Sequence, residues 1–427
     1  MTSTETDTHH DLHNPIYREF WTRDEQSIDA DLAELRAQPP QFLPEPDGSE
    51  LGLPSPGSWV VTRYDQILEM SKTPEIYSSA NGVTVIDSPP EFNEYFSSMI
   101  SMDDPRHAHL RKLVSAGFTP RMLAKLEDIV QAQASTIVDD VSERGTCDFV
   151  VDVAARLPLK IVCDLMGVPD SQIDFVFDQT NVILGVSDPE YGGLDDDPLS
   201  LLLNAGDGLS QLMYEVADSK VGSDSDDLTT MLVNAEVDGE KLSQQDIASF
   251  FILLVVAGNE TTRNAISWGL KYLTDNPDQR KIWTDDFERV GPGAVEEIVR
   301  LASPVTYMRR TATQDVELGG AKIAAGDKLC MFYLAANRDE DHFDDPYAFN
   351  VLRDPNRHLG FGGPGPHFCM GAHLARREIL VMFRELFERI PDIAATGPPD
   401  LLSASFIHGI KHLDASFTRS SCSIETN

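Results

Sequence analysis

One loop of the chain, residues 361–371, reads FGGPGPHFCMG and runs directly into a stretch with helical periodicity. Its glycines let the backbone come close to a flat ligand and turn amide N–H groups toward one point. Cys369 would lie at the N-terminus of the following helix, where the helix dipole and local amides favour a thiolate. A thiolate is a strong ligand for haem iron. The pattern predicts that Cys369 is a metal ligand rather than a buried free thiol.

A second feature is a long helix predicted over residues 242–275, roughly 50 Å at 1.5 Å per residue. Ser243 and Asp246 have the spacing of a capping box at its start. The stretch 250–256 is apolar on almost every side, which predicts a central, buried helix. The sequence AGNETT at 257–262 interrupts this apolar core, and such local violations tend to mark functional sites.

Each residue of this interruption has a possible role above a flat cofactor. Ala257 and Gly258 would leave room for it. Thr261 could hydrogen-bond bound oxygen, and Glu260 could relay protons toward it, so both are candidate catalytic residues. The alternative is a helix kink with a satisfied Glu at the surface.

The remaining pattern is mostly helical. Apolar residues recur at helical spacing from 106 to 285 and again from 370 to 390, and short strands are predicted at 59–62, 316–318 and 322–323. Glu297 and Arg300 lie three residues apart on one predicted helix face, a pair that is commonly solvated when nothing else marks it. We predict a mainly α fold with a small β subregion.

Composition limits the class of protein. The chain has 427 residues, of which 41% are hydrophobic, and no linker that would separate independent domains. We expect a single domain over 16–418, a disordered N-terminal tail over 1–15 and a flexible C-terminal tail over 419–427. The net charge of −36 disfavours nucleic acid and anionic membranes as partners.

The five cysteines are odd in number and form no CxxC pair, which disfavours a disulfide framework or a structural zinc site. The longest apolar run, 250–257, is too short for a transmembrane anchor. The polar, acidic start of the chain does not resemble a signal peptide. These features predict a soluble, cytoplasmic protein.

In this order and at these separations, the three motifs resemble those of the cytochrome P-450 family of haem-thiolate monooxygenases, over roughly residues 55 to 415. The resemblance implies the cytochrome P-450 fold, with a long central distal helix over a buried haem b. It also implies that Cys369 is the axial ligand and Glu260-Thr261 the acid–alcohol pair. Glu297, Arg300 and Arg353 would form a structural network.

The resemblance further implies which residues contact the cofactor. His107, Arg111, Arg310 and His367 would hold the haem propionates, and charge supports this pairing. The other implied cofactor contacts are Ala257, Gly258, Phe361, Cys369 and Gly371. One departure concerns Phe361, which lies eight residues before the cysteine instead of the family's usual seven, with Gly362 in the usual place. The resemblance therefore leaves the packing role of Phe361 open.

Within the family, the segments 234–240, 307–311 and 406–411 resemble the actinobacterial branch that hydroxylates terminal methyl groups of methyl-branched lipids and sterol side chains. We expect an apolar substrate, a branched-chain lipid, isoprenoid or sterol, in an apolar cavity. The predicted substrate contacts are Phe96, Ile100, Leu253, Val256, Ala257, Val305 and Phe406, of which two or three are expected to be core residues instead.

No flavin or iron–sulfur module fits in this length, so electrons should come from a ferredoxin and a ferredoxin reductase. Candidate basic residues for docking an acidic ferredoxin are Arg106, Lys112, Arg121, Lys125, Arg376 and Arg377. Three alternatives stay open: a peroxygenase driven by hydrogen peroxide, a tailoring hydroxylase of secondary metabolites, and a non-enzymatic haem sensor or carrier.

Overall fold

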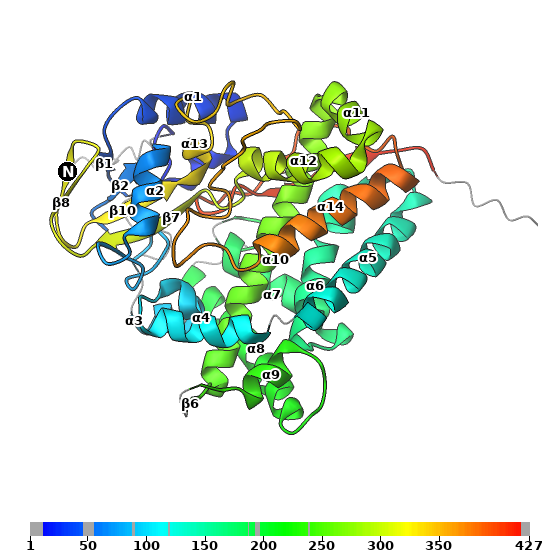
Figure 1. Cartoon of the computed structure of the whole chain (residues 1–427), viewed down its shortest axis with the longest axis horizontal. Helices are drawn as coiled ribbons and strands as arrows, with labels where there is room; N and C mark the ends of the chain where they lie inside the picture. Colours follow the sequence, from blue (N-terminus) through cyan, green and yellow to red (C-terminus); the bar gives the residue numbers. More distant parts are fainter. Residues whose placement is uncertain are drawn as a thin grey trace, which may run out of the picture.

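The computed structural model describes residues 12–45, 55–87, 90–117, 120–186, 188–192, 197–237 and 240–419. Helices make up most of the molecule, and a smaller region of strands lies to one side of them (Figure 1). Most of the two predicted tails lies outside the described residues. Asn14, which was assigned to the N-terminal tail, is already buried, and its Oδ1 accepts a hydrogen bond from the Ile16 N–H at 3.0 Å.

The long central helix is α10, Gln244–Asp275, which runs through the middle of the helical region (Figure 1). Ser243 and Asp246 form the predicted capping box, in which each side chain accepts the other residue's backbone N–H. The helix begins two residues later than predicted. It packs against α6, Arg156–Met166, and α8, Pro198–Lys220, so the expectation of a central buried helix is confirmed.

The other helices surround α10. Helix α12, Phe287–Ala302, and helix α14, Ala372–Arg389, pack against it and against each other. The remaining helices are α1 (Glu25–Arg36), α2 (Tyr64–Lys72), α3 (Pro90–Ser97), α4 (Arg106–Gly117), α5 (Pro120–Ser142), α7 (Ile173–Gly185), α9 (Leu228–Asn234), α11 (Pro277–Asp285) and α13 (Tyr333–Ala336).

The main sheet has five strands in the order β1-β2-β10-β7-β3. Their bounds are Gln41–Leu43 for β1, Ser58–Val61 for β2, Lys328–Phe332 for β10, Tyr307–Ala312 for β7 and Tyr77–Ser78 for β3. Only β10 and β2 run parallel, and they come from opposite ends of the sequence. The sequence predicted β2 but not its neighbour β10 or the next strand, β7. This sheet brings the segment with Arg310 next to the N-terminal region.

The small sheets tie the C-terminal region to the helical part. Strands β11 (Ala394–Ala395), β14 (Asp414–Ser416) and β4 (Thr146–Asp148) form one sheet, and β12 (Asp400–Leu401) pairs with β13 (Ile410–His412). Two hairpins complete the set: β8 (Val316–Leu318) with β9 (Ala321–Ile323), and β5 (Glu236–Val237) with β6 (Glu240–Lys241). In the part of the chain that the structure describes, no helix is both long and apolar enough to cross a bilayer.

Candidate functional site

A cavity of about 270 Å³ lies between α10 and the loop that precedes α14. It gathers residues from segments far apart in the sequence. The predicted site residues that line it are Ile100, His107, Arg111, Leu253, Ala257, Gly258, Thr261, Val305, Arg310, Phe361, His367, Cys369 and Gly371. The apolar residues predicted to contact the substrate and the basic and imidazole residues predicted to hold the haem propionates therefore line one cavity.

Three predicted substrate contacts are not among the described residues that line this cavity. Val256 is one residue away from Ala257 on α10, and one residue turns a helical side chain by about 100°. The Phe96 ring packs on α3 against Phe92, with ring centroids 4.5 Å apart. The Phe406 ring packs edge-on against Tyr307 at 5.5 Å. The structure therefore places these three side chains outside the cavity lining, in line with the expectation that two or three of the set are not substrate contacts.

Cys369 lies just before α14, which begins at Ala372 rather than at Met370 as predicted. Its N–H donates to the Phe361 carbonyl at 3.0 Å, which closes the loop. The Cys369 side chain is exposed, but to the cavity. Burial raises the pKa of this thiol, against the opposing effect of the Gly371 N–H and the Arg111 guanidinium. The amides at the helix start favour the thiolate, as expected, but burial outweighs them. A bound metal ion would instead deprotonate a coordinating thiol outright.

Phe361 lines the cavity, although it lies eight residues before Cys369 instead of seven. The guanidinium of Arg376 lies over the Phe361 ring, 4.3 Å from its centroid. Gly362 adopts φ of 83°, a left-handed conformation that favours glycine. A side chain at Gly365 would overlap the Ser71 carbonyl of α2. The glycines thus allow both the turn and its close packing against α2.

Four basic or imidazole side chains meet at one end of the cavity. Arg111 Nη2 donates to the Phe368 carbonyl at 2.6 Å, and Arg310 Nη1 donates to the Arg309 carbonyl at 2.7 Å. The His107 and His367 rings lie 4.3 Å apart. Burial, followed by the nearby charge of Arg310, lowers the pKa of His367 to about 3, so this imidazole is neutral and can donate from one ring nitrogen.

These groups test whether a haem fits. Arg310 is buried and has no carboxylate ion pair among the described residues, and the buried His107 Nε2 has no hydrogen-bond partner there. A buried cation without a counter-ion is costly, so this end of the cavity suits an anion with several acceptor oxygens. Two carboxylates on a flat apolar ring satisfy that requirement, and Cys369 lines the same cavity as a possible iron ligand. The residues therefore fit a haem.

The α10 wall of the cavity carries Thr261 and Thr262 among small and apolar groups. Thr261 Oγ1 donates to the Ala257 carbonyl at 2.6 Å, one turn earlier, so its lone pairs remain able to accept a hydrogen bond. A side chain at Gly258 would press against Val162 of α6. The small residues thus keep this part of the helix close to its neighbour and leave the cavity open.

Glu260 does not line the cavity with Thr261. It is fully buried and forms an ion pair with Arg263 one turn along α10, and Arg263 Nη1 donates to Asn181 Oδ1 of α7 at 3.0 Å. Burial raises the pKa of Glu260, against the effect of Arg263. Its Oε1 and both amide atoms of Asn259 have no partner among the described residues, which suits buried water. The alternative of a surface Glu is thereby excluded.

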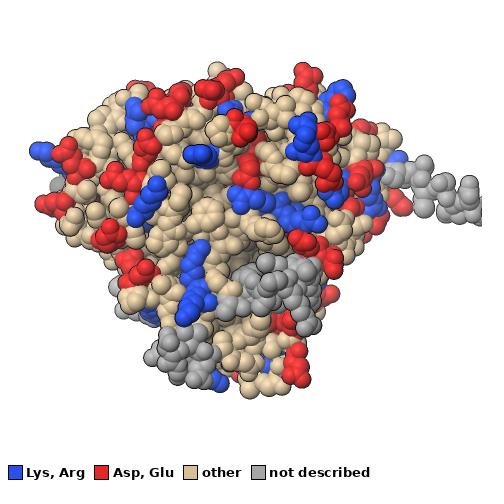
Figure 2. All heavy atoms as spheres, in the orientation of Figure 1, with Lys and Arg blue, Asp and Glu red and all other residues tan. Residues whose placement is uncertain are grey.

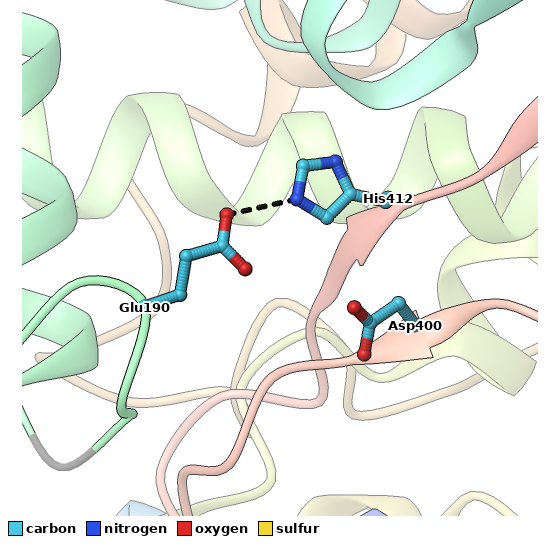
Figure 3. Close-up of side chains that lie close together, drawn as sticks. All are labelled: Glu190, Asp400 and His412. Carbon is cyan, nitrogen blue, oxygen red and sulfur yellow. Dashed lines mark hydrogen bonds and ion pairs between the residues drawn. The ribbon is translucent and has the colours of Figure 1, made fainter.

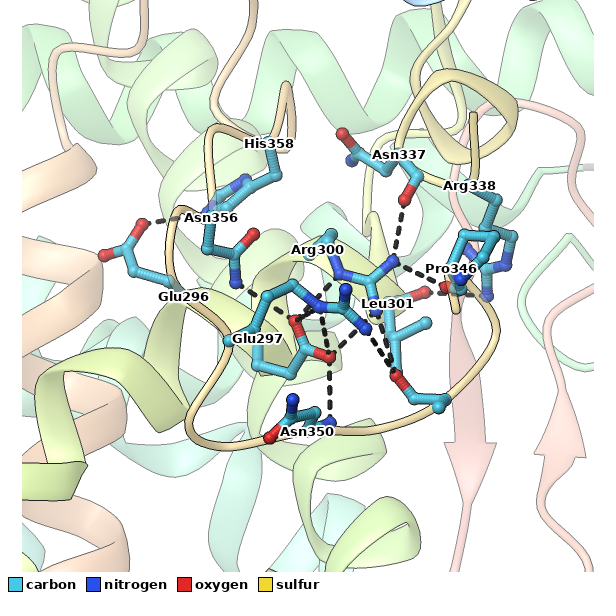
Figure 4. Close-up of polar contacts among 12 residues, drawn as sticks. Glu296, Glu297, Arg300, Leu301, Asn337, Arg338, Pro346, Asn350, Asn356 and His358 are labelled. Carbon is cyan, nitrogen blue, oxygen red and sulfur yellow. Dashed lines mark hydrogen bonds and ion pairs between the residues drawn. The ribbon is translucent and has the colours of Figure 1, made fainter. Parts of the chain in front are cut away.

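Glu297 and Arg300 form a buried, bidentate pair at 2.8 Å for each hydrogen bond (Figure 4). Arg353 Nε donates to the same carboxylate at 3.1 Å, as the resemblance implied. Further partners of this pair are the Asn350 N–H, the Asn356 amide and the carbonyls of Asn337, Pro346 and Ala348. The pair thereby fixes the segment 337–356 that leads to the cysteine loop.

Sequence reasoning missed several groups that line the cavity, and it also missed the partner of Arg376. Glu378 of α14 lines the cavity, and burial raises the pKa of its carboxyl to about 8. Its position four residues from both Leu374 and Met382, on the apolar face of the helix, was the available signal. Arg376 pairs with Glu296 of α12 at 2.5 Å and 3.0 Å, rather than with neighbours on its own helix.

Comparison with known proteins is consistent with this geometry. The family model described as cytochrome P450 matches residues 207–290 and 292–390. The methyl-branched lipid omega-hydroxylase of Mycobacterium tuberculosis strain H37Rv is 48% identical over 406 residues, which cover 94% of this chain and 93% of that protein. The steroid C26-monooxygenase of Mycolicibacterium smegmatis is 37% identical over 91% of this chain and 90% of that protein.

Among solved structures, a cytochrome P450 of Mycobacterium marinum in complex with pseudoionone superposes with a TM-score of 0.90. It is 42% identical in sequence, and the match covers 94% of this chain and 97% of the other. A cytochrome P450 from the bacillaene polyketide synthase of Bacillus subtilis superposes with a TM-score of 0.83 at 28% identity, over 95% and 99% of the two chains.

Proposed function

The chain belongs to the cytochrome P450 family and is a monooxygenase, and we propose that it hydroxylates a terminal methyl group of a methyl-branched lipid or sterol side chain. The observation that carries this proposal is the cavity, which joins a mainly apolar wall, the Thr261 hydroxyl and the Cys369 thiol. An apolar cavity with few polar groups suits an apolar ligand. The omega-hydroxylase and C26-monooxygenase names of the relatives support the terminal position.

The proposed cofactor site uses Cys369 and the residues at the cationic end of the cavity. Cys369 would supply the thiolate ligand of a haem b, and Arg111, Arg310, His107 and His367 would hold its carboxylates. When bound, the haem supplies an iron at which dioxygen is reduced and its O–O bond cleaved. The apolar side chains of Ile100, Leu253 and Val305 would orient the substrate and exclude water.

The test is an optical titration of the haem-loaded protein with lipids matched in length. A methyl-branched chain and a sterol with its side chain should change the haem spectrum at lower concentration than an unbranched chain. Product analysis should then find the hydroxyl group on a terminal methyl carbon. Equal affinity for all three lipids, or oxidation in mid-chain, would contradict the proposed substrate class.

Thr261→Ala is expected to bind substrate normally but to lower the yield of product per reductant consumed. Thr261 carries a hydroxyl on the α10 wall, and this hydroxyl would pass protons to oxygen in the cavity. Loss of such proton delivery costs about 10²–10⁴-fold in rate, and the reductant would appear as hydrogen peroxide. Thr261→Ser is the matched variant, because it retains the hydroxyl. An unchanged ratio of product to consumed reductant in Thr261→Ala would contradict the role of Thr261 in proton delivery.

We further propose that the enzyme is soluble and cytoplasmic and receives electrons from a ferredoxin. Both proteins would be acidic, so docking needs a local basic area, and charges beyond the Debye length of about 8 Å are largely screened. Figure 2 shows such areas, with Lys and Arg side chains grouped among the acidic ones. Arg376 is a weaker candidate than expected, because its guanidinium is paired with Glu296. The side chains of Arg121 and Lys125 lie outside those described.

Lys112 is exposed on α4, directly after the cavity-lining Arg111. Lys112→Gln is expected to slow reduction by ferredoxin about two- to fivefold at low salt, the effect of one exposed ion pair. The control is Lys281→Gln on α11, which lies on the other side of the molecule and pairs with Asp285 (Figure 1). Stopped-flow reduction over a series of salt concentrations measures both. If Lys112→Gln is reduced at the parent's rate and with the parent's salt dependence, the ferredoxin docks elsewhere.

A further inference from the structure

The carboxylate of Glu296 on α12 binds a residue on each side of the cysteine loop, residues 361–371. Before the loop, His358 Nε2 lies 2.8 Å from Glu296 Oε2. After the loop, Arg376 of α14 donates from Nε to Oε1 at 2.5 Å and from Nη2 to Oε2 at 3.0 Å. One carboxylate therefore joins the two segments that flank Cys369, and we call these three side chains the Glu296 clamp.

The hydrogen bonds of His358 determine which of its ring nitrogens carries the hydrogen. Nδ1 accepts the Gly360 N–H at 3.1 Å. The hydrogen of the neutral imidazole therefore lies on Nε2 and is donated to Glu296. The His358 side chain is only 2% exposed, so bulk water does not compete for these bonds. His358 thus connects Glu296 to the backbone just before the loop.

Phe361, the first residue of the loop, packs against both partners of Glu296. The Arg376 guanidinium lies over the Phe361 ring, 4.3 Å from its centroid, and the His358 ring centroid is 5.8 Å away. The Phe361 carbonyl accepts the Cys369 N–H at 3.0 Å. Phe361 therefore links the clamp to the cysteine, through its ring on one side and its backbone on the other.

Close packing against α12 holds the start of the loop in place as well. A Cβ atom at Gly360 would lie 2.7 Å from Cγ1 of Val299. Val299 follows Glu296 by three residues, so both lie on one face of α12. Gly360 and Val299 both line the cavity. The face of α12 that carries the clamp therefore also forms part of the cavity wall next to the loop.

Glu296 and Glu297 are adjacent, but they bind different partners (Figure 4). Successive side chains on a helix diverge by about 100°. Glu297 is directed to Arg300 and Arg353, whereas Glu296 is directed to the residues that flank the cysteine loop. The clamp can therefore be removed without breaking the buried pair of α12.

The clamp keeps its charge over a wide range of pH. Burial raises the pKa of the Glu296 carboxyl, but hydrogen bonds from His358 and Arg376 outweigh burial and lower this pKa to about 2. The contribution of Glu296 is therefore present above its ordinary pKa of 4.5 and is lost only as the pH falls through about 2. Its effect should not change between pH 6 and pH 8.

We propose that Glu296 is a positioning residue for the iron ligand: by holding His358 and Arg376, it keeps the cysteine loop in the arrangement that presents the Cys369 sulfur to the cavity. This inference rests on the proposed role of Cys369 as the ligand. Without the clamp, the loop adopts further arrangements in which the sulfur takes up a proton or moves away from the metal. The contacts of the clamp itself depend on no cofactor.

The test compares haem-loaded Glu296→Gln with the parent, reduced by dithionite under carbon monoxide so that no protein donor is involved. Gln keeps the size of Glu but loses the charge and one acceptor oxygen. The absorption band of the thiolate complex should be lost about tenfold faster, an effect typical of hydrogen bonds to charged groups. The reduction potential should become more positive, because a less firmly held thiolate donates less electron density to iron. Glu296→Asp retains the charge and should restore part of both properties.

Glu288→Gln is the control for the change of charge. Glu288 also joins α12 to α14, because it pairs with Arg384 at 2.8 Å. Neither residue belongs to the segment 358–376 that contains the cysteine loop and its two clamped neighbours. Glu288→Gln should therefore keep the band and the potential of the parent.

His358→Phe tests the other half of the clamp. Phe keeps a ring at this buried position but loses both hydrogen bonds, so this variant should behave like Glu296→Gln. His412→Phe is its control. His412 Nε2 likewise lies 2.8 Å from a glutamate, Glu190 (Figure 3), but His412 is not among the described residues that line the cavity. His412→Phe should keep the band and the potential.

A band and a potential equal to the parent's in Glu296→Gln would overturn the positioning role. Equal effects in Glu288→Gln would overturn it too, because any loss of charge between the two helices would then suffice. Amide hydrogen exchange of residues 358–371 measures the clamp directly and should be faster in Glu296→Gln. Faster exchange with an unchanged band would mean that the clamp holds the loop but not the ligand, and would overturn the proposal. If Cys369→Ser keeps the band, the proposed ligand alone is wrong, whatever the exchange shows.

Discussion

Cys369→Ser is expected to abolish monooxygenase activity and the absorption band of the carbon monoxide complex after which the family is named. As the proposed iron ligand, Cys369 presents its sulfur to the cavity. Serine has nearly the same size, but its hydroxyl is a far weaker donor to iron than a thiolate. The loop should survive the change, because its closure depends on the Cys369 N–H and the Phe361 carbonyl. The reduced spectrum with carbon monoxide measures the outcome.

Cys147→Ser and Cys163→Ser are the matched controls. Both cysteines are buried away from the cavity, and burial raises the pKa of each thiol to about 12, so neither is set up to form a thiolate. These variants should retain the band and the activity. The proposed ligand would be excluded if Cys369→Ser kept the band, or if either control variant lost it while remaining folded.

The parts of the fold that the sequence predicted depend on local patterns. The apolar middle and the capping box define α10 from residues that are close in sequence, and both were predicted nearly to the residue. The pairing of β2 with β10 joins Trp59 to Leu329, and no local pattern reports such a contact. For this reason the sequence predicted a strand at β2 but missed its neighbour β10 and the next strand, β7.

Local sequence patterns also fail to predict which single side chains line the cavity. The cationic residues that gather at its end came from the family resemblance, because their positions in the sequence are scattered. Helical periodicity correctly assigned Leu253 and Ala257 to the cavity side of α10 but wrongly included Val256. An error of one residue rotates a side chain by about 100°, which is enough to turn it away from the cavity.

Glu260 illustrates why a buried charge is hard to interpret from sequence. The sequence showed that a charged residue in the middle of an apolar helix is energetically costly. It left two possibilities open: that Glu260 relays protons, or that its side chain lies at the surface. The structure adds a partner, Arg263, and that partner's neighbour Asn181 on α7, about eighty residues earlier in the chain. Only tertiary packing brings these groups together, so the ionic environment of Glu260 could not have been predicted.

The other large expected effect concerns the buried pair on α12. Glu297→Gln should lower the free energy of unfolding by about 3–5 kcal/mol, the cost of leaving a buried charge without its partner. Arg300 is fully buried, and Arg353 nearly so, and both donate to the Glu297 carboxylate. A neutral amide keeps the shape but removes the charge that both cations need. The segment 337–356, which leads to the cysteine loop, should also become less ordered, so the haem content should fall. Urea unfolding and haem absorbance measure the two effects.

Glu288→Gln on the same helix is the control. Glu288 pairs with Arg384 at 2.8 Å but is 80% exposed, and exposed ion pairs contribute about 0–1 kcal/mol. The pH dependence gives a second check. Hydrogen bonds from Arg300 lower the pKa of Glu297 despite its burial, so its contribution to stability is present above its ordinary pKa of 4.5 and is lost as the pH falls through the lowered value. The parent should therefore lose more stability in acid than Glu297→Gln. Equal loss in the two proteins would mean that Glu297 does not stabilise the fold through its charge.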